Sequence, residues 1–411
     1  MTRRRQLAAA LGLVALAAPV AAHAQEFPTI RDRDYTLDLH QGAVLGSGRI
    51  VGMGGAAVAT AEGSSGLLFN PAAVAVRPAT STGTWDWDWH LDWLTPQIGT
   101  DFDNNGLTQE TDVDLIDALI TGGLVGQYGP WGLGVTVMSF AQPLEREADG
   151  SRVVPRVAVV RASLARSLWA DQITVGVGLR AGTFSIARRM ESEAGAITET
   201  VDLFSLTGTG LEAGAIWRPR DLDLRAGLSA SLPVSSEEVE VANCDPLACE
   251  GFVLPERAAA PWQLSLGVAW RRAATRWNRT VATTWRDERY LLLAADLVVT
   301  GHVPHGHGVE AFSRMQLQPS GRDVGVSPRL GAEYEWLPGR LRVRGGSYWE
   351  PSRFRDPRGE DVRGRLHLTL GLDVRIWQFC FWNERYRLRL SVTGDGADGY
   401  GNGGLSIGFW H

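Results

Sequence analysis

The stretch TWDWDWHLDWL, from Thr84 to Leu94, constrains the fold of this chain more than any other part of the sequence. Large apolar residues alternate there with acidic residues and one histidine, in the order Trp85, Asp86, Trp87, Asp88, Trp89, His90, Leu91, Asp92 and Trp93. Successive side chains of a strand point to opposite faces, so a period of two predicts a β-strand. One face of this strand requires apolar surroundings and the other requires polar ones.

The same alternation recurs along the chain and predicts fourteen strands, at 81–94, 115–128, 131–140, 153–167, 172–187, 201–217, 221–234, 261–272, 289–301, 324–337, 340–350, 362–376, 385–394 and 403–411. Many of these runs exceed the ~5–6 residues of an ordinary soluble strand and suit the ~9–11 residues with which a tilted strand crosses a bilayer. Short turns alternate with long polar loops, as in outer-membrane barrels. The connection 273–288 is long where a short turn is expected, and the pattern offers no explanation for it.

These features predict an all-β fold, a transmembrane antiparallel β-barrel of about fourteen strands over residues 81–411. The apolar faces would then contact lipid, where tryptophan suits the membrane–water boundary, and the polar faces would line a lumen. A large soluble β-sandwich is the alternative, because it also contains alternating strands. That fold would have to bury all the large residues of the 84–94 strand in a protein core.

The first residues predict export from the cytoplasm. Residues 1–24 have the layout of a signal peptide, with Arg3-Arg4-Arg5, an apolar run over 6–20 and the cleavage sequence Ala22-His23-Ala24. After residue 24 no run of 18 apolar residues follows, so we expect no spanning helix. All 40 basic residues are arginine, and the net charge of −6 argues against nucleic-acid binding.

Residues 25–80 do not alternate, and they contain a recognisable motif. Arg49, Gly52-Met53-Gly54-Gly55-Ala56 and Ala59 are followed by Asn70-Pro71-Ala72. This arrangement resembles the opening segment R-x-x-G-M-G-G-A-x-x-A, then N-P-A, of the FadL/TodX outer-membrane transport proteins and their PorV-like relatives. The resemblance implies a fourteen-stranded barrel whose N-terminal segment, here 25–80, folds into the lumen as a hatch. It also implies that ligand passage is gated by Arg49, Gly52, Gly54, Gly55, Asn70 and Pro71.

The resemblance implies a function as well: a bacterial outer-membrane channel for passive uptake of hydrophobic small molecules, such as long-chain fatty acids or aromatic compounds. The expected partners are therefore a hydrophobic ligand and membrane lipid, with no nucleic acid, and we expect a monomer. Two other functions stay open. One is a PorV-like scaffold or shuttle for secreted proteins, and the other is a barrel-wall hydrolase. Since no serine is placed beside His90 or His367 by the sequence, we do not expect an enzyme.

Arginines gather on the polar faces of the last predicted strands, namely Arg342, Arg344, Arg363, Arg365, Arg385, Arg387 and Arg389. If the strands follow one another in order, these residues share one inner wall. They could form an anion-attracting patch for a fatty carboxylate. They could equally form a ladder paired with carboxylates such as Glu333, Glu335 and Asp373. Pairing is expected in either case, because unpaired charges packed together are costly.

Two smaller motifs complete the sequence predictions. Asp101, Asp103, Asn105 and Asp112 have the oxygen spacing of a calcium loop, although aspartate replaces the usual glutamate at the twelfth position. A solvated acidic loop is the alternative, and no other cofactor is predicted. Cys244 and Cys249 are expected to form a disulfide that closes a small polar loop of an exported protein. Cys380, in an aromatic run, is expected to be buried.

Overall fold

The computed structural model describes residues 27–81, 83–96, 101–107, 119–141, 151–191, 197–236, 245–249, 251–279, 285–381 and 384–410. Within these ranges fourteen long strands form an antiparallel sheet that closes on itself, because β18 pairs with β2. The predicted barrel and its strand number are therefore confirmed. The strands are β2 Trp85–Pro96, β3 Leu119–Tyr128, β4 Trp131–Ala141, β5 Ser151–Leu168, β6 Ile173–Glu191, β7 Ile197–Trp217, β8 Leu224–Ser231, β11 Gln263–Arg272, β12 Leu291–Thr300, β14 Gly325–Leu337, β15 Leu341–Glu350, β16 Arg365–Phe381, β17 Glu384–Ala397 and β18 Tyr400–Phe409.

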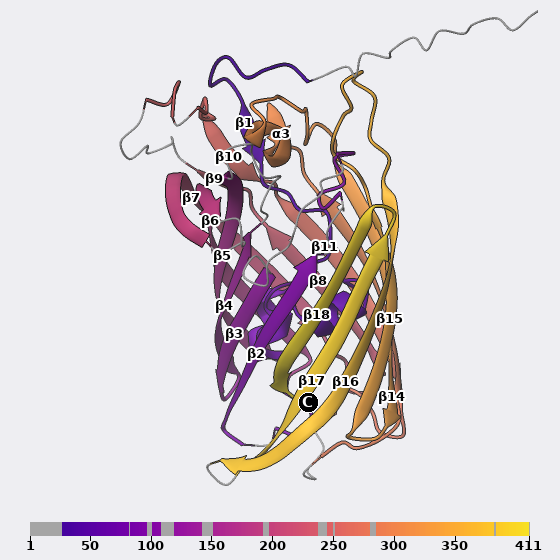
Figure 1. Ribbon diagram of the computed structural model, residues 1–411. Coiled ribbons are helices and arrows are strands. Elements are labelled where there is room, and N and C mark those ends of the chain that lie inside the picture. Colours follow the sequence, from indigo (N-terminus) through magenta and orange to yellow (C-terminus); the bar gives the residue numbers. More distant parts are fainter. Residues whose placement is uncertain are drawn as a thin grey trace, which may run out of the picture.

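The two ends of the barrel differ in their connections (Figure 1). Tight turns join β3 to β4, β5 to β6, β7 to β8 and β14 to β15 at one end, which we call the short-turn end. The last strand, β18, also finishes there. The opposite end, the long-loop end, carries most of the longer connections and most of the small accessory elements. Two connections depart from this division, namely the long β11–β12 connection at the short-turn end and the short β17–β18 turn at the long-loop end.

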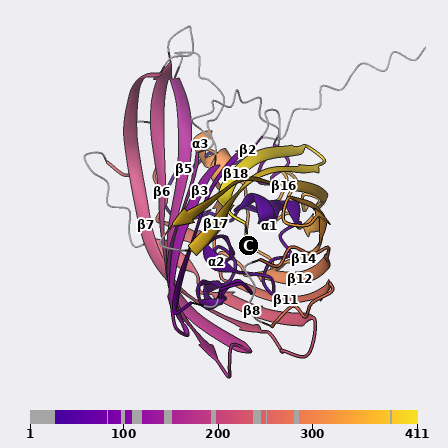
Figure 2. The same ribbon diagram turned by 90° about the horizontal axis from the view of Figure 1, so that it is seen from below.

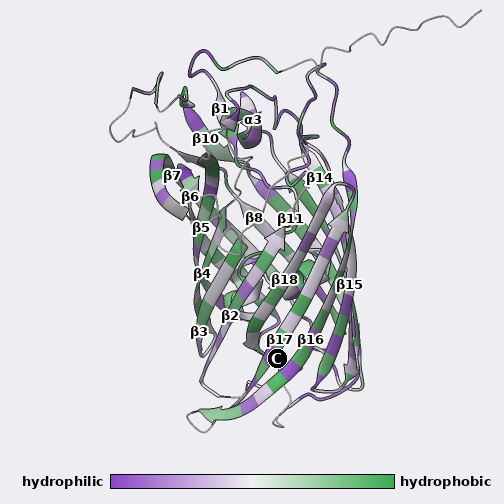
Figure 3. Cartoon of the chain, in the orientation of Figure 1, coloured by the Kyte–Doolittle hydropathy of each residue, from purple (hydrophilic) through white to green (hydrophobic). Residues whose placement is uncertain are grey.

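The strand that opens the barrel separates its two kinds of side chain as its sequence predicts. His90 and Asp92 are buried inside, whereas Leu91 and Trp93 are 49% and 41% exposed on the outside. Figure 3 shows the resulting alternation of hydrophobic and hydrophilic residues along the strands. Trp87 and Trp89 are half-buried, because both stand edge-on to Phe409. Within the described ranges, no helix combines the length and the apolar character needed to cross a membrane.

Residues 43–76, which we call the lumenal segment, lie inside the ring of strands (Figure 2). They form three short helical turns, α1 Gly48–Gly52, α2 Gly63–Gly66 and the 3-10 turn η1 Pro71–Ala75. Turn η1 packs on β5, β6 and β7, and α1 packs on β16 and β17. Small residues dominate the segment, and small residues allow backbone to approach the barrel wall closely.

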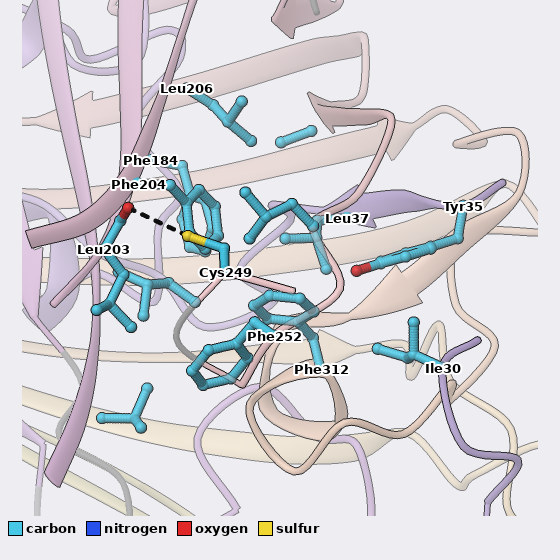
Figure 4. Close-up of a cluster of buried hydrophobic side chains, with 14 residues drawn as sticks. Ile30, Tyr35, Leu37, Phe184, Leu203, Phe204, Leu206, Cys249, Phe252 and Phe312 are labelled. Atoms are coloured by element: carbon cyan, nitrogen blue, oxygen red, sulfur yellow. Dashed lines mark hydrogen bonds between the residues drawn. The ribbon is translucent and has the colours of Figure 1, made fainter. Parts of the chain in front are cut away.

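A second group of short elements covers the long-loop end: β1 Thr36–Asp38, β9 Val234–Ser236, β10 Arg257–Ala260, β13 Gly306–Gly308 and α3 Val309–Ser313. Strand β1 pairs in parallel with both β10 and β13. Tyr35 and Leu37 pack there with Phe204, Phe252 and Phe312 in an apolar cluster (Figure 4). Residues 27–39 therefore belong to a cap at the mouth. From the sequence we expected these residues in the lumen. The strand pattern did not show that β1 would pair with β10 and β13, two short strands within the long loops.

The cysteines differ in environment. Cys249 is buried in the cap cluster, with its sulfur 3.8 Å from the carbonyl oxygen of Leu203 (Figure 4). It is disulfide-bonded. Cys244 lies outside the described residues, so the proposed pairing stays a prediction. Cys380 is exposed, and the expectation that it is buried is wrong. It lies in the β16–β17 hairpin opposite Arg385, at the end of the strands where little protein is left to cover it.

Candidate functional site

A cavity opens inside the barrel between the cap and the lumenal segment, and we call it the upper chamber. Its apolar wall combines residues of the cap, of β4 and of β5 to β7, namely Leu39, Met138, Val157, Val159, Leu206 and Val234. Its polar side is shared with an adjoining hollow that reaches Leu68 and Phe69 of the lumenal segment. The polar residues common to both parts are Gln41, Arg161, Arg180, Gln263 and Arg329.

The charges of the upper chamber do not balance. Arg161, Arg180 and Arg329 line it, whereas Glu212 is the one carboxylate in the described lining. Arg161 Nε lies 3.4 Å from a Glu212 oxygen, and Arg180 donates to the carbonyl of Leu232 at 3.1 Å. The Nε atoms of both arginines are buried without a hydrogen-bond acceptor. The chamber thus presents an apolar wall beside unsatisfied cationic donors.

One histidine of the chamber does not change this balance. His40 also lines the cavity. Burial, together with the positive charges of Arg353 and Arg329, lowers the pKa of His40 to about 3. The imidazole is therefore neutral at physiological pH and leaves the arginine excess unchanged.

Carboxylates of the barrel wall hold the lumenal segment by its backbone. An oxygen of Asp296 on β12 accepts hydrogen bonds from the amides of Ala57 and Val58, at 2.7 and 2.8 Å. Asp88 on β2 accepts from the amide and the hydroxyl of Ser64. Bonds from N–H groups to an ionised acceptor are among the stronger ones. The acidic face of the 84–94 strand therefore anchors the segment that closes the chamber from below.

Two residues of the N-terminal motif have clear structural roles. The side chain of Asn70 donates to the carbonyls of Val58, Ala215 and Leu228, and its oxygen accepts from Ala72 at the start of η1. Gly54 has φ +61°, and a Cβ there would lie 2.6 Å from the backbone nitrogen of Ser347 on β15. Asparagine thus joins the backbone at Val58, within the segment, to β7 and β8 of the wall, and glycine provides space where the segment touches the wall.

Solved structures of known proteins resemble this barrel over nearly the whole chain. A Pseudomonas aeruginosa FadL homologue aligns over 90% of this chain and 99% of its own, with TM-score 0.54 and 13% identity. The Pseudomonas putida toluene transporter TodX aligns over 92% and 99%, with TM-score 0.51 and 12% identity. The Ralstonia pickettii toluene transporter TbuX aligns over 90% and 100%, with TM-score 0.50 and 14% identity.

This chain has the FadL/TodX-type barrel fold. At such low identity the likeness concerns the fold alone. No family model and no curated protein sequence matches the chain.

The other motif residues of this FadL/TodX-type barrel lie where the segment meets the wall or turns. Gly52 ends α1 against Gly371 of β16, and Pro71 begins η1. Gly55 has φ +73° and packs close to Arg329 of the upper chamber. Arg49 points to the other side of the segment, where its Nε lies 3.4 Å from Glu333. The predicted gating residues therefore lie where the lumenal segment contacts the wall or turns, and their gating role stays a prediction.

Most of the predicted arginine wall is a paired network. Arg344 contacts Glu333 and Asp373, Arg389 contacts Asp373, and Arg342 contacts Glu335. Arg365 and Arg387 pair with Glu350 and Asp287. The two remaining members, Arg363 and Arg385, are exposed and stand apart from this network. The ladder interpretation therefore describes these strands better than a free anion patch, and the unbalanced arginines of the upper chamber lie elsewhere, on β5, β6 and β14.

The structure brings a serine beside one lumenal histidine, which the sequence did not indicate. Ser64 Oγ lies 2.8 Å from His90 Nδ1, and His90 Nε2 lies 3.5 Å from Asp92. However, the Ser64 hydroxyl donates to Asp88 at 2.8 Å, and Ser64 has no exposed surface. A nucleophilic serine must reach its substrate and give its proton to the histidine. This arrangement instead serves to hold α2 against β2.

Asp101 and Asn105 of the predicted calcium loop use their oxygens within the protein, whereas one oxygen of Asp103 is buried without a hydrogen-bond partner. Asp101 accepts from the amides of Asn105 and Gly106, both at 2.8 Å, and the Asn105 side chain donates to Glu310 of α3. Burial, with the nearby charges of Glu310 and Asp101, raises the pKa of Asp103. Among the described residues no group of three or more His, Cys, Asp or Glu side chains is placed to hold a metal. Asp112 lies outside them, so calcium binding stays a prediction.

Proposed function

We propose that this protein is an outer-membrane channel for passive uptake of hydrophobic small molecules, and that its preferred ligands carry an acidic head group. The observation that carries the proposal is the upper chamber, where an apolar wall faces three arginines and one glutamate. An amphiphile with a carboxylate would satisfy both halves of such a cavity. A ligand site commonly combines mostly apolar walls with a few placed polar groups.

The location of the site suits uptake from outside the cell. Short turns face the periplasm and long loops face outward in barrels of the outer membrane. The upper chamber then opens toward the exterior, below the cap, and the lumenal segment lies between it and the periplasmic end. The solved barrels with this fold include two named as toluene transporters, which supports a hydrophobic ligand class. We further propose that the mature chain begins after residue 24, acts as a monomer and passes its ligand by a shift of the lumenal segment.

The test compares an acid with its neutral analogue. Binding of dodecanoate and of dodecan-1-ol to the full chain in lipid nanodiscs is measured by calorimetry. We expect tighter binding of the acid. We also expect that Arg180→Gln weakens dodecanoate binding about tenfold, because a hydrogen bond to a charged group contributes roughly 1.5–3 kcal/mol. Binding of the alcohol should change little.

Arg358→Gln, in an exposed loop, is the matched control and should leave both affinities unchanged. Equal binding of acid and alcohol by the unaltered protein would contradict the acidic-ligand part of the proposal. Absence of binding for both would contradict the hydrophobic channel itself. A stable secreted protein bound to the outer loops, with no amphiphile binding, would favour the scaffold function instead.

A further inference from the structure

A second cavity lies at the short-turn end, below the lumenal segment, and we call it the lower vestibule. Its roof includes Arg49 and Glu62 of the lumenal segment, and its wall includes Arg271 and Arg389 of β11 and β17. Its remaining side is formed by the described parts of the connection between β11 and β12, 273–279 and 285–290. This is the connection whose length the strand pattern did not explain.

The connection is attached to the barrel around this cavity. The side chain of Asn278 donates to the carbonyls of Pro219, Leu222 and Leu224, at 2.9–3.1 Å. Trp277 lies under the guanidinium of Arg225 at 4.0 Å, and Trp285 lies under that of Arg387 at the same distance. The connection therefore brings two tryptophans to the cavity and holds them by cation–π contacts.

The buried polar atoms of the lower vestibule that lack a hydrogen-bond partner are all nitrogens. They are Nη1 of Arg271, Nε of Arg286, Nε of Arg389, Nε1 of Trp285 and Nε2 of His90. Arg271 and Arg389 are only 5% and 7% exposed. No buried side-chain oxygen of the described lining lacks a hydrogen-bond partner. The four guanidinium and indole nitrogens only donate, so their missing partner must be an acceptor. His90 Nε2 is not counted with them, because an imidazole nitrogen can itself accept.

Guanidinium donors favour a negatively charged acceptor, because hydrogen bonds between ionised groups are the stronger ones. Six arginines line the cavity, namely Arg49, Arg225, Arg271, Arg286, Arg342 and Arg389, against four carboxylates. The carboxylates already have partners: Glu62 pairs with Arg225, Asp88 accepts from Ser64, Asp287 binds Arg387, and Glu333 pairs with Arg344. The other lining arginines pair with carboxylates just outside the lining: Arg271 and Arg286 with Glu288, Arg342 with Glu335, and Arg389 with Asp373. What the cavity offers a ligand is therefore its unpartnered donor atoms rather than unpaired charge.

We propose that the lower vestibule is an exit subsite that binds the carboxylate of a hydrophobic ligand on the periplasmic side of the lumenal segment. Arg271 and Arg389 would receive the carboxylate, and the rings of Trp277, Trp285 and Trp410 would contact the apolar body. This inference rests on the proposed function, because it places a second binding site for the same ligand class at the other end of the channel. The long β11–β12 connection would then serve as one wall of this binding site.

Photo-crosslinking tests the subsite directly. The full chain in nanodiscs is labelled with a dodecanoate that carries a diazirine at its apolar end, and the labelled peptides are mapped by mass spectrometry. We expect labelling of peptides that contain Trp277, Trp285 or Trp410. Excess dodecanoate should suppress it, whereas dodecan-1-ol and inorganic phosphate should not. Suppression by phosphate would instead assign the donors to a phosphate group, from a free ion or a lipid, and would overturn the carboxylate assignment.

Variants separate this subsite from the upper chamber. Arg271→Gln and Arg389→Gln should each lower labelling of the lower vestibule about tenfold and leave labelling near Arg180 unchanged. Arg276→Gln, on the same connection but outside the cavity lining, is the matched control. Labelling confined to the upper chamber would overturn the exit subsite and leave the proposed function standing. No labelling at either place would overturn both. Competition in the unaltered protein does not depend on whether the variants fold.

Discussion

At the scale of single residues, the lumen depends on backbone contacts that only small side chains permit. The approach of Gly54 to β15 is the clearest case, because Gly346 lies opposite it and a Cβ at Gly346 would lie 2.4 Å from the nitrogen of Gly54. Both sides of this contact are glycine. The lumenal segment is thereby held at a backbone-to-backbone distance from β15, while Asp296 of the nearby strand β12 binds its amides.

Replacing Gly54 by alanine should displace the lumenal segment. The positive φ alone costs an L-residue roughly 1–2 kcal/mol, and the clash with β15 adds about 1–3 kcal/mol more. Gly129 is a matched control, since it has φ +55° in the turn before β4 but a Cβ there would meet nothing within 4 Å. We expect Gly54→Ala to accelerate hydrogen exchange over residues 50–58, measured by mass spectrometry. Gly129→Ala should leave exchange there unchanged, and equal behaviour of the two variants would contradict the close-contact role.

At the scale of elements, the described parts of the connection 273–290 contain neither helix nor strand, yet they are attached to the barrel. Asp287 joins it to the barrel through two hydrogen bonds to Arg387, at 2.6 and 2.9 Å. Arg279 makes a second ion pair with Asp221, but both of those side chains are well exposed. A half-buried bidentate pair should contribute more than an exposed pair, because solvent screens the latter.

The Asp287→Asn change should therefore loosen the connection. We expect trypsin to cleave at Arg279 or Arg286 about threefold to tenfold faster than in the unaltered protein, since a weakened charged hydrogen bond raises the population of the open form. Thermal unfolding of the barrel should stay nearly unchanged. Asp221→Asn removes the exposed pair of the same connection and should have little effect on cleavage. Unchanged cleavage in Asp287→Asn would mean that the other contacts of the connection, such as those of Asn278 and Trp277, hold it without this pair.

The elements also show what the sequence could and could not predict. Strand periodicity is local, so the alternation in residues 84–94 sufficed to place Asp88, His90 and Asp92 inside and Leu91 and Trp93 outside. The sites depend on chain segments far apart. Arg180 and Arg329, from β6 and β14, line the same cavity, and Trp277 reaches Arg225 only because the connection folds back. Arg385 was expected on the inner wall, but it lies opposite Cys380 near the end of the β16–β17 hairpin, where both side chains are exposed.

At the scale of the whole molecule, the lumenal segment divides the barrel into two cavities that both contain buried arginine nitrogens without a hydrogen-bond partner. Its hold on the wall includes one ion pair that responds to acid, between Glu62 and Arg225. Burial would raise the pKa of Glu62, but the positive charges of Arg225 and Arg49 outweigh it and hold the pKa at about 2. A carboxyl whose pKa is lowered in the folded state stabilises that state above its ordinary pKa of 4.5, and this contribution is lost as the pH falls toward 2.

Acid should therefore loosen the lumenal segment and open the barrel to ions. In planar bilayers we expect the conductance of the unaltered protein to be low at pH 7 and to rise as the pH falls from about 4.5 toward 2. Glu62→Gln removes the charge at every pH, so its conductance should already be raised at pH 7 and should depend less on acid. Glu256→Gln, an exposed residue of the cap, should behave like the unaltered protein. If Glu62→Gln retained both the low conductance at neutral pH and the full acid response, the ion pair would not be what keeps the lumenal segment in place.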